Sequence, residues 1–169
     1  MKSFRRTLCL LPAVMMLIGL CGCSSGTGPE GPDLDPVDMV RAMMDVDTTL
    51  PEMLVRSSGE DGAEDSFFYL SNLDYNKVEA YCYAYADAGT AEEMAVVKLK
   101  SAGDAAAMMD TLHDHIEARQ GTFREYDPAQ VPLTENAVIT REGRYVTLIV
   151  SGKNGLAQKE FRKFFAESE

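Results

Sequence analysis

Four polar side chains at helical spacing are the clearest candidates for metal or acid-base chemistry: Asp110, His113, Asp114 and Glu117. Their offsets of three and four place carboxylates and an imidazole on one side of a helix. Such a set could hold a divalent metal and serve a small metal-dependent hydrolase. A structural zinc site needs four closed ligands, however, and only one histidine faces these acids. We therefore expect a solvated polar face without a metal or cofactor, and the hydrolase is the alternative function.

Three tyrosines at alternating positions form the second candidate site: Tyr81, Tyr83 and Tyr85. Alternation puts them on one side of a strand and the small residues 80, 82 and 84 on the other. If helices cover the small side, the tyrosines form an exposed stripe that suits sugar stacking or a protein interface. This stripe would lie near Glu79, Lys98 and Lys100. If the tyrosines fill the core instead, the small side is exposed, and large side chains favour this second arrangement.

Two further features have weaker chemical interpretations. The acids at 60, 61, 64 and 65 could hold calcium, but their spacing does not match an EF-hand loop, and a solvated acidic loop is expected. Cys82 shares a strand side with small residues, which favours a buried core thiol over a nucleophile. The GxSxG, HExxH and P-loop motifs are absent. We therefore expect no catalytic residues and no enzymatic activity.

The amino terminus has the pattern of a secretory signal. Lys2, Arg5 and Arg6 precede an apolar stretch over residues 8–20, which is shorter than the roughly 20 residues of a bilayer span. Leu20-Cys21-Gly22-Cys23 resembles the bacterial lipobox. This resemblance implies lipid attachment at Cys23, whose acyl chains would anchor the protein stably at the extracytoplasmic face of the cell membrane. The alternatives are an uncleaved signal anchor and a secreted protein cut elsewhere.

Length and charge limit the remaining possibilities. The chain has 169 residues, of which 46% are hydrophobic and 25% charged, as in an ordinary globular protein. A net charge of −11 excludes nucleic acid as a partner, because phosphate binding needs a basic surface. Removal of residues 1–22 takes away three bases and no acids, so the formal charge becomes −14. We expect a signal peptide over 1–22, a lipidated cysteine with a flexible tether over 23–36, and one domain over 37–169.

Hydrophobic periodicity predicts the order of elements in this domain. A helix capped by Asp35 begins at Pro36, a long helix covers 102–121, and a last helix contains Phe161. Four alternating segments predict two strand pairs: 78–86 with 94–100, and 133–140 with 144–150. Residues 50–55 are either irregular or an edge strand. The order α, ββ, α, ββ, α predicts an α+β fold with a four-stranded antiparallel sheet and helices mainly on one face.

Six segments of the chain can be compared with known families: the capped helix at 35–36, Leu-Pro-Glu-Met at 50–53, Ala-Glu-Glu-Met-Ala-Val at 91–96, Glu-Ala-Arg-Gln at 117–120, Glu-Asn-Ala-Val-Ile at 135–139 and Gly-Arg-Tyr-Val at 143–146. Together they resemble a family of small Gram-positive lipoproteins that is defined only by a domain of unknown function. The similarity covers about residues 35–165 and implies an envelope lipoprotein with an α+β domain. It implies no activity and no site residues. Together with the absence of the usual catalytic motifs, this resemblance favours a non-enzymatic binding or accessory module that engages an envelope protein or a cell-wall glycan.

Overall fold

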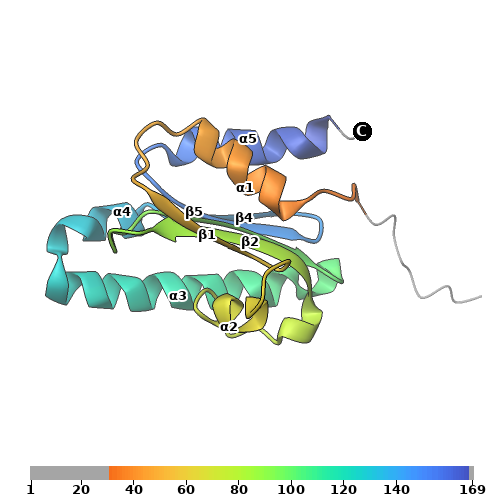
Figure 1. Cartoon of the computed structure of the whole chain (residues 1–169), viewed down its shortest axis with the longest axis horizontal. Coiled ribbons are helices and arrows are strands. Elements are labelled where there is room, and N and C mark those ends of the chain that lie inside the picture. Colours follow the sequence, from red (N-terminus) through yellow and green to blue (C-terminus); the bar gives the residue numbers. More distant parts are fainter. Residues whose placement is uncertain (1–30, 168–169) are drawn as a thin grey trace, which may run out of the picture.

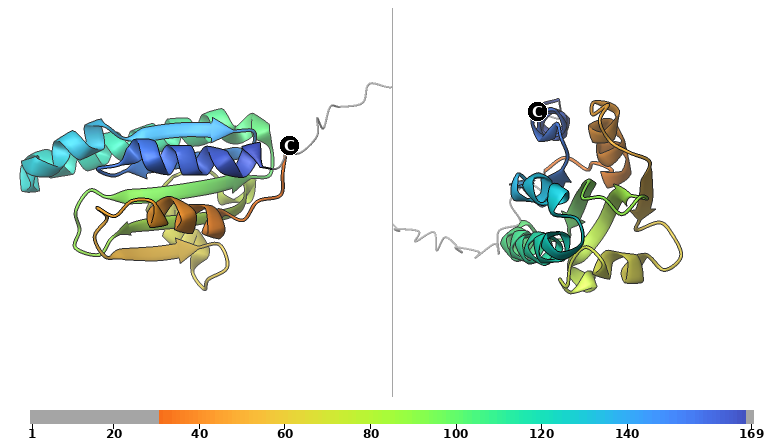
Figure 2. Two further views of the ribbon diagram at one scale, coloured as in Figure 1. Left: turned by 90° about the horizontal axis from the view of Figure 1, so that it is seen from above. Right: turned by 90° about the vertical axis from the view of Figure 1, so that its left-hand side faces the viewer.

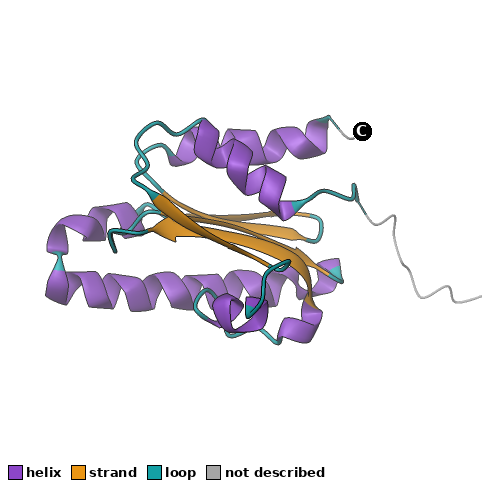
Figure 3. Ribbon diagram, in the orientation of Figure 1, coloured by secondary structure: helices purple, strands orange, loops and turns teal. Residues whose placement is uncertain are grey.

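The computed structural model describes residues 31–167, so the predicted signal peptide and Cys23 lie outside the described residues. Figure 3 shows helices and strands in separate colours. The helices are α1 (Pro36–Asp45), α2 (Ala63–Phe68), α3 (Ala105–Tyr126), α4 (Val131–Glu135) and α5 (Asn154–Ala166). The strands are β1 (Met53–Ser57), β2 (Val78–Ala86), β3 (Glu93–Leu99), β4 (Val138–Glu142) and β5 (Tyr145–Val150).

The strands form one antiparallel sheet in the order β1-β2-β3-β5-β4. The α+β class is therefore confirmed, but the prediction of four strands is wrong, because the described residues contain five. The additional strand is β1, which pairs with β2 at the edge of the sheet. Its side chains are only partly buried, so the alternation that marks a strand in sequence is weak there.

Helices cover both faces of the sheet (Figure 1). Helices α1 and α5 lie on one face, and α2 and α3 lie on the other. The expectation of helices mainly on one face is therefore wrong. Strands β3 and β5 are buried along their whole length, as expected of strands packed on both sides. The nearly continuous apolar runs over 94–97 and 145–150 carried this signal in the sequence.

Each face has its own apolar core. Helices α1 and α5 lie side by side over one of them (Figure 2), which includes Met39, Met43, Cys82, Met94, Tyr145, Ile149 and Phe161. The other core lies under α2 and α3 and includes Phe67, Tyr81, Tyr83, Val97, Met108, Leu112, Phe123 and Leu148. Residues 31–167 thus form three layers, with the sheet in the middle.

Local sequence features explain why helices α1, α3 and α4 form where they do. The Asp35 side chain accepts a hydrogen bond from the amide of Val37 at 2.8 Å, and Pro36 stands in the first turn, where its missing N–H costs nothing. Helix α3 buries residues at offsets of three and four, including Met108, Leu112 and Ile116. Residues 131–135, part of which was expected to form a strand, are helical, with a proline in the first turn.

Within the described part of the chain, no helix combines the length and the apolar character that crossing a bilayer requires.

Candidate functional site

A pocket of about 460 Å³ opens on the α3 side of the sheet and is the strongest candidate for a functional site. Its strand residues are Arg56 on β1 and Tyr83 and Tyr85 on β2. Arg56 stands directly opposite Tyr83 in the antiparallel pair, so both side chains leave the same face of the sheet. The remaining lining residues come from α2 and the position after it and from α3: Ser66, Tyr69, His115 and Arg119. The volume is within the range of small-molecule sites.

A buried carboxyl group, that of Glu93 at the start of β3, holds three of these lining side chains in place. Glu93 is 0% exposed. Its Oε2 accepts a hydrogen bond from the hydroxyl of Tyr83 at 2.7 Å and lies 2.9 Å from Nε2 of His115. Its Oε1 lies 3.1 Å from Nε of Arg119. Because a buried acid is tolerated only when it is paired, this cluster fixes the pocket wall.

The hydroxyl of Tyr83 acts as a donor in this cluster. Burial, together with the neighbouring Glu93 carboxyl group, raises the pKa of Tyr83 well above its ordinary value. The phenol therefore stays protonated at physiological pH. The rings of Tyr83 and Tyr85 lie 5.1 Å apart at 35°, and this pair forms the aromatic floor of the pocket.

Two guanidinium groups give the pocket hydrogen-bond donors that the fold leaves unused. Arg119 donates from Nη2 to the carbonyl of Thr90 at 3.0 Å, and its Nη1 has no partner among residues 31–167. Arg56 donates only to the carbonyl of Val55, at 2.9 Å, and forms no ion pair with any described residue. No Asp or Glu is among the described residues that line the pocket. Free arginine donors suit a carboxylate or a phosphate.

The predicted tyrosine site is only partly in this pocket. Tyr81 is fully buried and donates to the carbonyl of Ala63 at 2.6 Å, and burial raises its pKa to about 12. Tyr83 is buried and Tyr85 is half-buried. The tyrosines thus fill the core on the α3 side, while the small residues 80, 82 and 84 face the α1 and α5 side. The structure covers both sides of the strand, which neither sequence interpretation included.

The predicted polar patch on α3 lies away from the pocket. Its four residues are exposed: Asp110, His113, Asp114 and Glu117. None of them lines the pocket, where the other histidine, His115, stands instead. Among the described residues, no group of three or more His, Cys, Asp or Glu side chains is arranged to hold a metal ion. In the described part of the chain, these four side chains therefore do not converge with other polar groups at the pocket, as the alternative hydrolase would require.

The two weaker candidates are also placed by the structure. Cys82 is a free, buried cysteine in the core under α1 and α5. Burial raises the pKa of its thiol to about 12, which keeps it protonated and unreactive. The acids at 60, 61, 64 and 65 are exposed at the start of α2 and in the turn before it.

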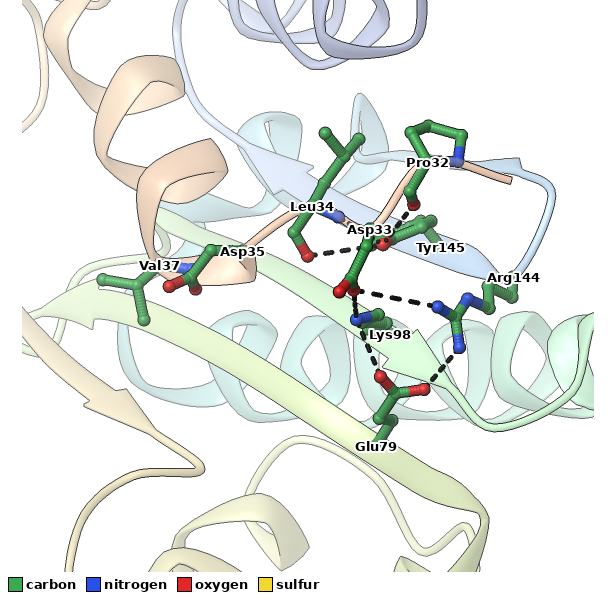
Figure 4. Close-up of polar contacts among 9 residues, drawn as sticks. All are labelled: Pro32, Asp33, Leu34, Asp35, Val37, Glu79, Lys98, Arg144 and Tyr145. Carbon is green, nitrogen blue, oxygen red and sulfur yellow. Dashed lines mark hydrogen bonds and ion pairs between the residues drawn. The ribbon is translucent and has the colours of Figure 1, made fainter. Parts of the chain in front are cut away.

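A second polar cluster, on the opposite face of the sheet, binds a segment that we call the N-terminal strap, residues 32–35 (Figure 4). The hydroxyl of Tyr145 donates to the carbonyl of Pro32 at 2.8 Å and accepts from the amide of Leu34 at 2.8 Å. Lys98 pairs with Asp33 and lies 2.7 Å from Glu79. Residues 32–36 of the predicted tether therefore belong to the fold.

The strap cluster contains two cations that are almost completely removed from solvent. The side chains of Lys98 and Arg144 are 7% and 9% exposed. Arg144 pairs with Glu79 and lies 3.9 Å from Asp33. Burial lowers the pKa of Lys98, but hydrogen bonds to Asp33 and Glu79 outweigh this, and the net shift is upward. Each buried cation thus has a carboxyl partner.

A β-bulge explains why Glu79 is on this face and not beside the tyrosines. The β2–β3 register shifts between Val78 and Ala80, so Glu79 is an additional residue and alternation restarts after it. Glu79 then turns toward Lys98. Because Lys98 stands opposite Ala80, it also leaves the face opposite the tyrosines, and the expectation that Lys98 is near the tyrosine stripe is wrong.

Sequence reasoning missed three of the four residues in the cluster around Glu93, and helical spacing could have found two of them. His115 and Arg119 are seven and eleven positions after Met108, which puts them on the same stripe of α3 as the buried residues. A histidine and an arginine on an apolar stripe require buried polar partners. The third, Glu93, lies just before the segment that was expected to form its strand.

Comparison with known proteins connects this fold to one family. The comparison with curated proteins and the comparison with solved structures each gave no match. The family model described as "Domain of unknown function (DUF4358)" matches residues 57–151. This match spans α2, β2 to β5 and α3, including Glu93, His115 and Arg119, and begins one residue after Arg56. Since it covers more than half of the 169 residues, the chain belongs to the DUF4358 family.

Proposed function

We propose that this protein is a lipid-anchored lipoprotein of the cell envelope whose domain is a non-enzymatic binding module, and that the pocket is its binding site. The anchor proposal rests on the signal pattern and the lipobox resemblance at Cys23. The binding proposal rests on one observation, the pocket itself. It combines a fixed wall with the free donors of Arg56 and Arg119.

The internal pairing of the polar groups supports binding over catalysis. Glu93 has no exposed surface, and it is engaged by Tyr83, His115 and Arg119. A group held in this way positions its neighbours but does not itself reach a substrate. The residues that line the pocket carry guanidinium, imidazole, hydroxyl and aromatic groups, which suit recognition of a ligand. The proposed partner is another component of the cell envelope.

The anchor proposal is tested by replacing Cys23. The Cys23→Ala variant cannot accept the lipid on sulfur, so it is expected to take up no label when cells grow with radioactive palmitate, whereas the wild-type chain is labelled. The Cys82→Ala variant is the matched control, because Cys82 is buried in the domain, and it is expected to be labelled like the wild type. Equal labelling of Cys23→Ala and wild type would contradict lipid attachment at Cys23.

The binding proposal is tested by photocrosslinking in intact membranes. Tyr69 lines the pocket and is 80% exposed, so a benzoylphenylalanine placed there is expected to form a discrete adduct with the bound component. Tyr126 is 83% exposed and does not line the pocket, which makes it the control position. Mass spectrometry identifies the adducts. The same adducts from both positions, or none from Tyr69, would argue against a pocket function.

A further inference from the structure

The pocket offers a ligand three things at once: cationic donors, aromatic faces and neutral polar groups. Arg56 and Arg119 supply the donors. Their free N–H groups are notable in a chain with a net charge of −11, because acids elsewhere are abundant and still leave Arg56 without an ion pair among the described residues. A guanidinium group with unused N–H donors at a pocket favours an external anion.

The aromatic part of the pocket favours a ring next to that anion. Tyr85 is half-buried, and its ring packs against that of Tyr83 at 5.1 Å, so Tyr85 is held in place while part of it stays open to the pocket. Tyr69 also lines the pocket and is 80% exposed, so its ring is open to a ligand. Tyrosine rings combine apolar surface with a hydroxyl group, which suits one face of a sugar.

The neutral polar groups favour a ring that carries hydroxyl groups over a purely apolar one. Ser66 contributes a hydroxyl group, and Tyr69 and Tyr85 contribute two more. His115 also lines the pocket, where its Nε2 atom is engaged by Glu93. A volume of about 460 Å³ is large enough for one such ring with a single charged substituent.

We propose that the pocket binds an anionic sugar of monosaccharide size, with its carboxylate or phosphate held by Arg56 and Arg119 and its ring against Tyr85. This inference rests on the proposed binding function and names its ligand class. The shared chemistry is an oxyanion on a hydroxylated ring. A sugar acid and a sugar phosphate both have it, and the probes below separate the two.

The test uses the full chain in detergent micelles, ¹⁵N-labelled, and titrates it with glucuronate, glucose 1-phosphate and the neutral methyl glucoside. Saturable shifts of amide signals near Tyr83, Tyr85 and Arg119 are expected with at least one anionic probe. The neutral sugar is expected to bind at least about tenfold more weakly, because it lacks a charge-assisted hydrogen bond. Preference for one anionic probe identifies the carboxylate or the phosphate as the natural group.

Three variants assign the interaction to named residues. Arg56→Gln is expected to weaken the anionic probes by about tenfold or more, and Tyr85→Leu to weaken them severalfold while the spectrum stays folded. Arg141→Gln removes the same charge from an exposed strand residue outside the pocket lining and is expected to change nothing.

Two results would overturn the ligand class: no saturable shift with either anionic probe, or equal affinities of Arg56→Gln and the wild type. Equal binding of the neutral sugar would also overturn it. The crosslinking experiment at Tyr69 separates these failures from failure of the proposed function. A discrete adduct there, without anionic-sugar binding, leaves a binding module with a different ligand.

Discussion

The Glu93→Leu variant is expected to lose about 3–5 kcal/mol of unfolding free energy, because it removes one partner of a buried charged cluster. Arg119 would keep a buried Nε without its carboxyl group, and the hydroxyl of Tyr83 would lose its acceptor. Urea unfolding followed by circular dichroism measures the change. Glu142→Leu, at a half-exposed strand position whose ion pair with Arg162 is 3.9 Å long, is the control and is expected to lose less than about 1 kcal/mol.

A double-mutant cycle shows whether the loss comes from pairing. If Glu93 and Arg119 act as a pair, replacing both with leucine is expected to cost less than the sum of the two single substitutions. Glu93→Gln keeps the shape and an acceptor for Tyr83, so it is expected to be milder than Glu93→Leu. Additive losses would show that Glu93 and Arg119 do not act as a pair, and a Glu93→Leu variant as stable as the control would show that the cluster does not stabilise the fold.

The Lys98→Met variant is expected to release the strap and to lower the unfolding free energy by about 1–2 kcal/mol. The loss is moderate because the carboxyl partners of Lys98, Asp33 and Glu79, are partly exposed to solvent. Hydrogen exchange of the Leu34 amide, which donates to Tyr145, reports on the strap directly. Its protection factor is expected to fall relative to that of the Met39 amide in α1. Lys100→Met, at an exposed neighbouring position, is expected to leave both protection factors unchanged.

The strap is also expected to respond to acid in a defined direction. The hydrogen bond and the charge of Lys98 lower the pKa of Asp33 below its ordinary value of 3.8. The contribution of Asp33 is therefore fully present above pH 3.8 and is lost as the pH falls through the lowered pKa. In the wild type, the protection factor of the Leu34 amide is expected to fall as the pH drops below 3.8. In the Lys98→Met variant, this pH-dependent fall is expected to be absent. A strap that stays equally protected at low pH would contradict this role of Asp33.

The elements with strong periodic patterns could be predicted, and the failures have specific physical causes. The long helix, the β2–β3 pair and the β4–β5 pair were expected in the correct order. The segment at 53–57 has no clear alternation of apolar and polar residues, because its side chains are partly exposed on both sides of this edge strand. The coverage of both faces was missed because the alternation at Tyr81, Tyr83 and Tyr85 indicates one buried side, whereas the nearly continuous apolar runs of β3 and β5 indicate two.

The site was harder to predict than the fold because its residues come from five segments that only the tertiary structure brings together. Arg56 is on the edge strand that the pattern left open, and Glu93 is separated from His115 by 22 positions. The bulge at Glu79 adds a further limit. One additional residue in a strand moves every following side chain to the opposite side of the sheet. The local composition around Glu79 contains no signal for this bulge.

The strap and the pocket are on opposite faces of the sheet, and this arrangement determines how the domain would sit at a membrane. Because residues 32–35 are fastened to Lys98, Arg144 and Tyr145, a lipid on Cys23 would be connected to the α1 and α5 side. The tether would then consist of residues 24–31 alone, which reach at most about 28 Å when fully extended. If Cys23 carries a lipid, this tether would keep the α1 and α5 side near the bilayer and leave the pocket on the side that faces away from it.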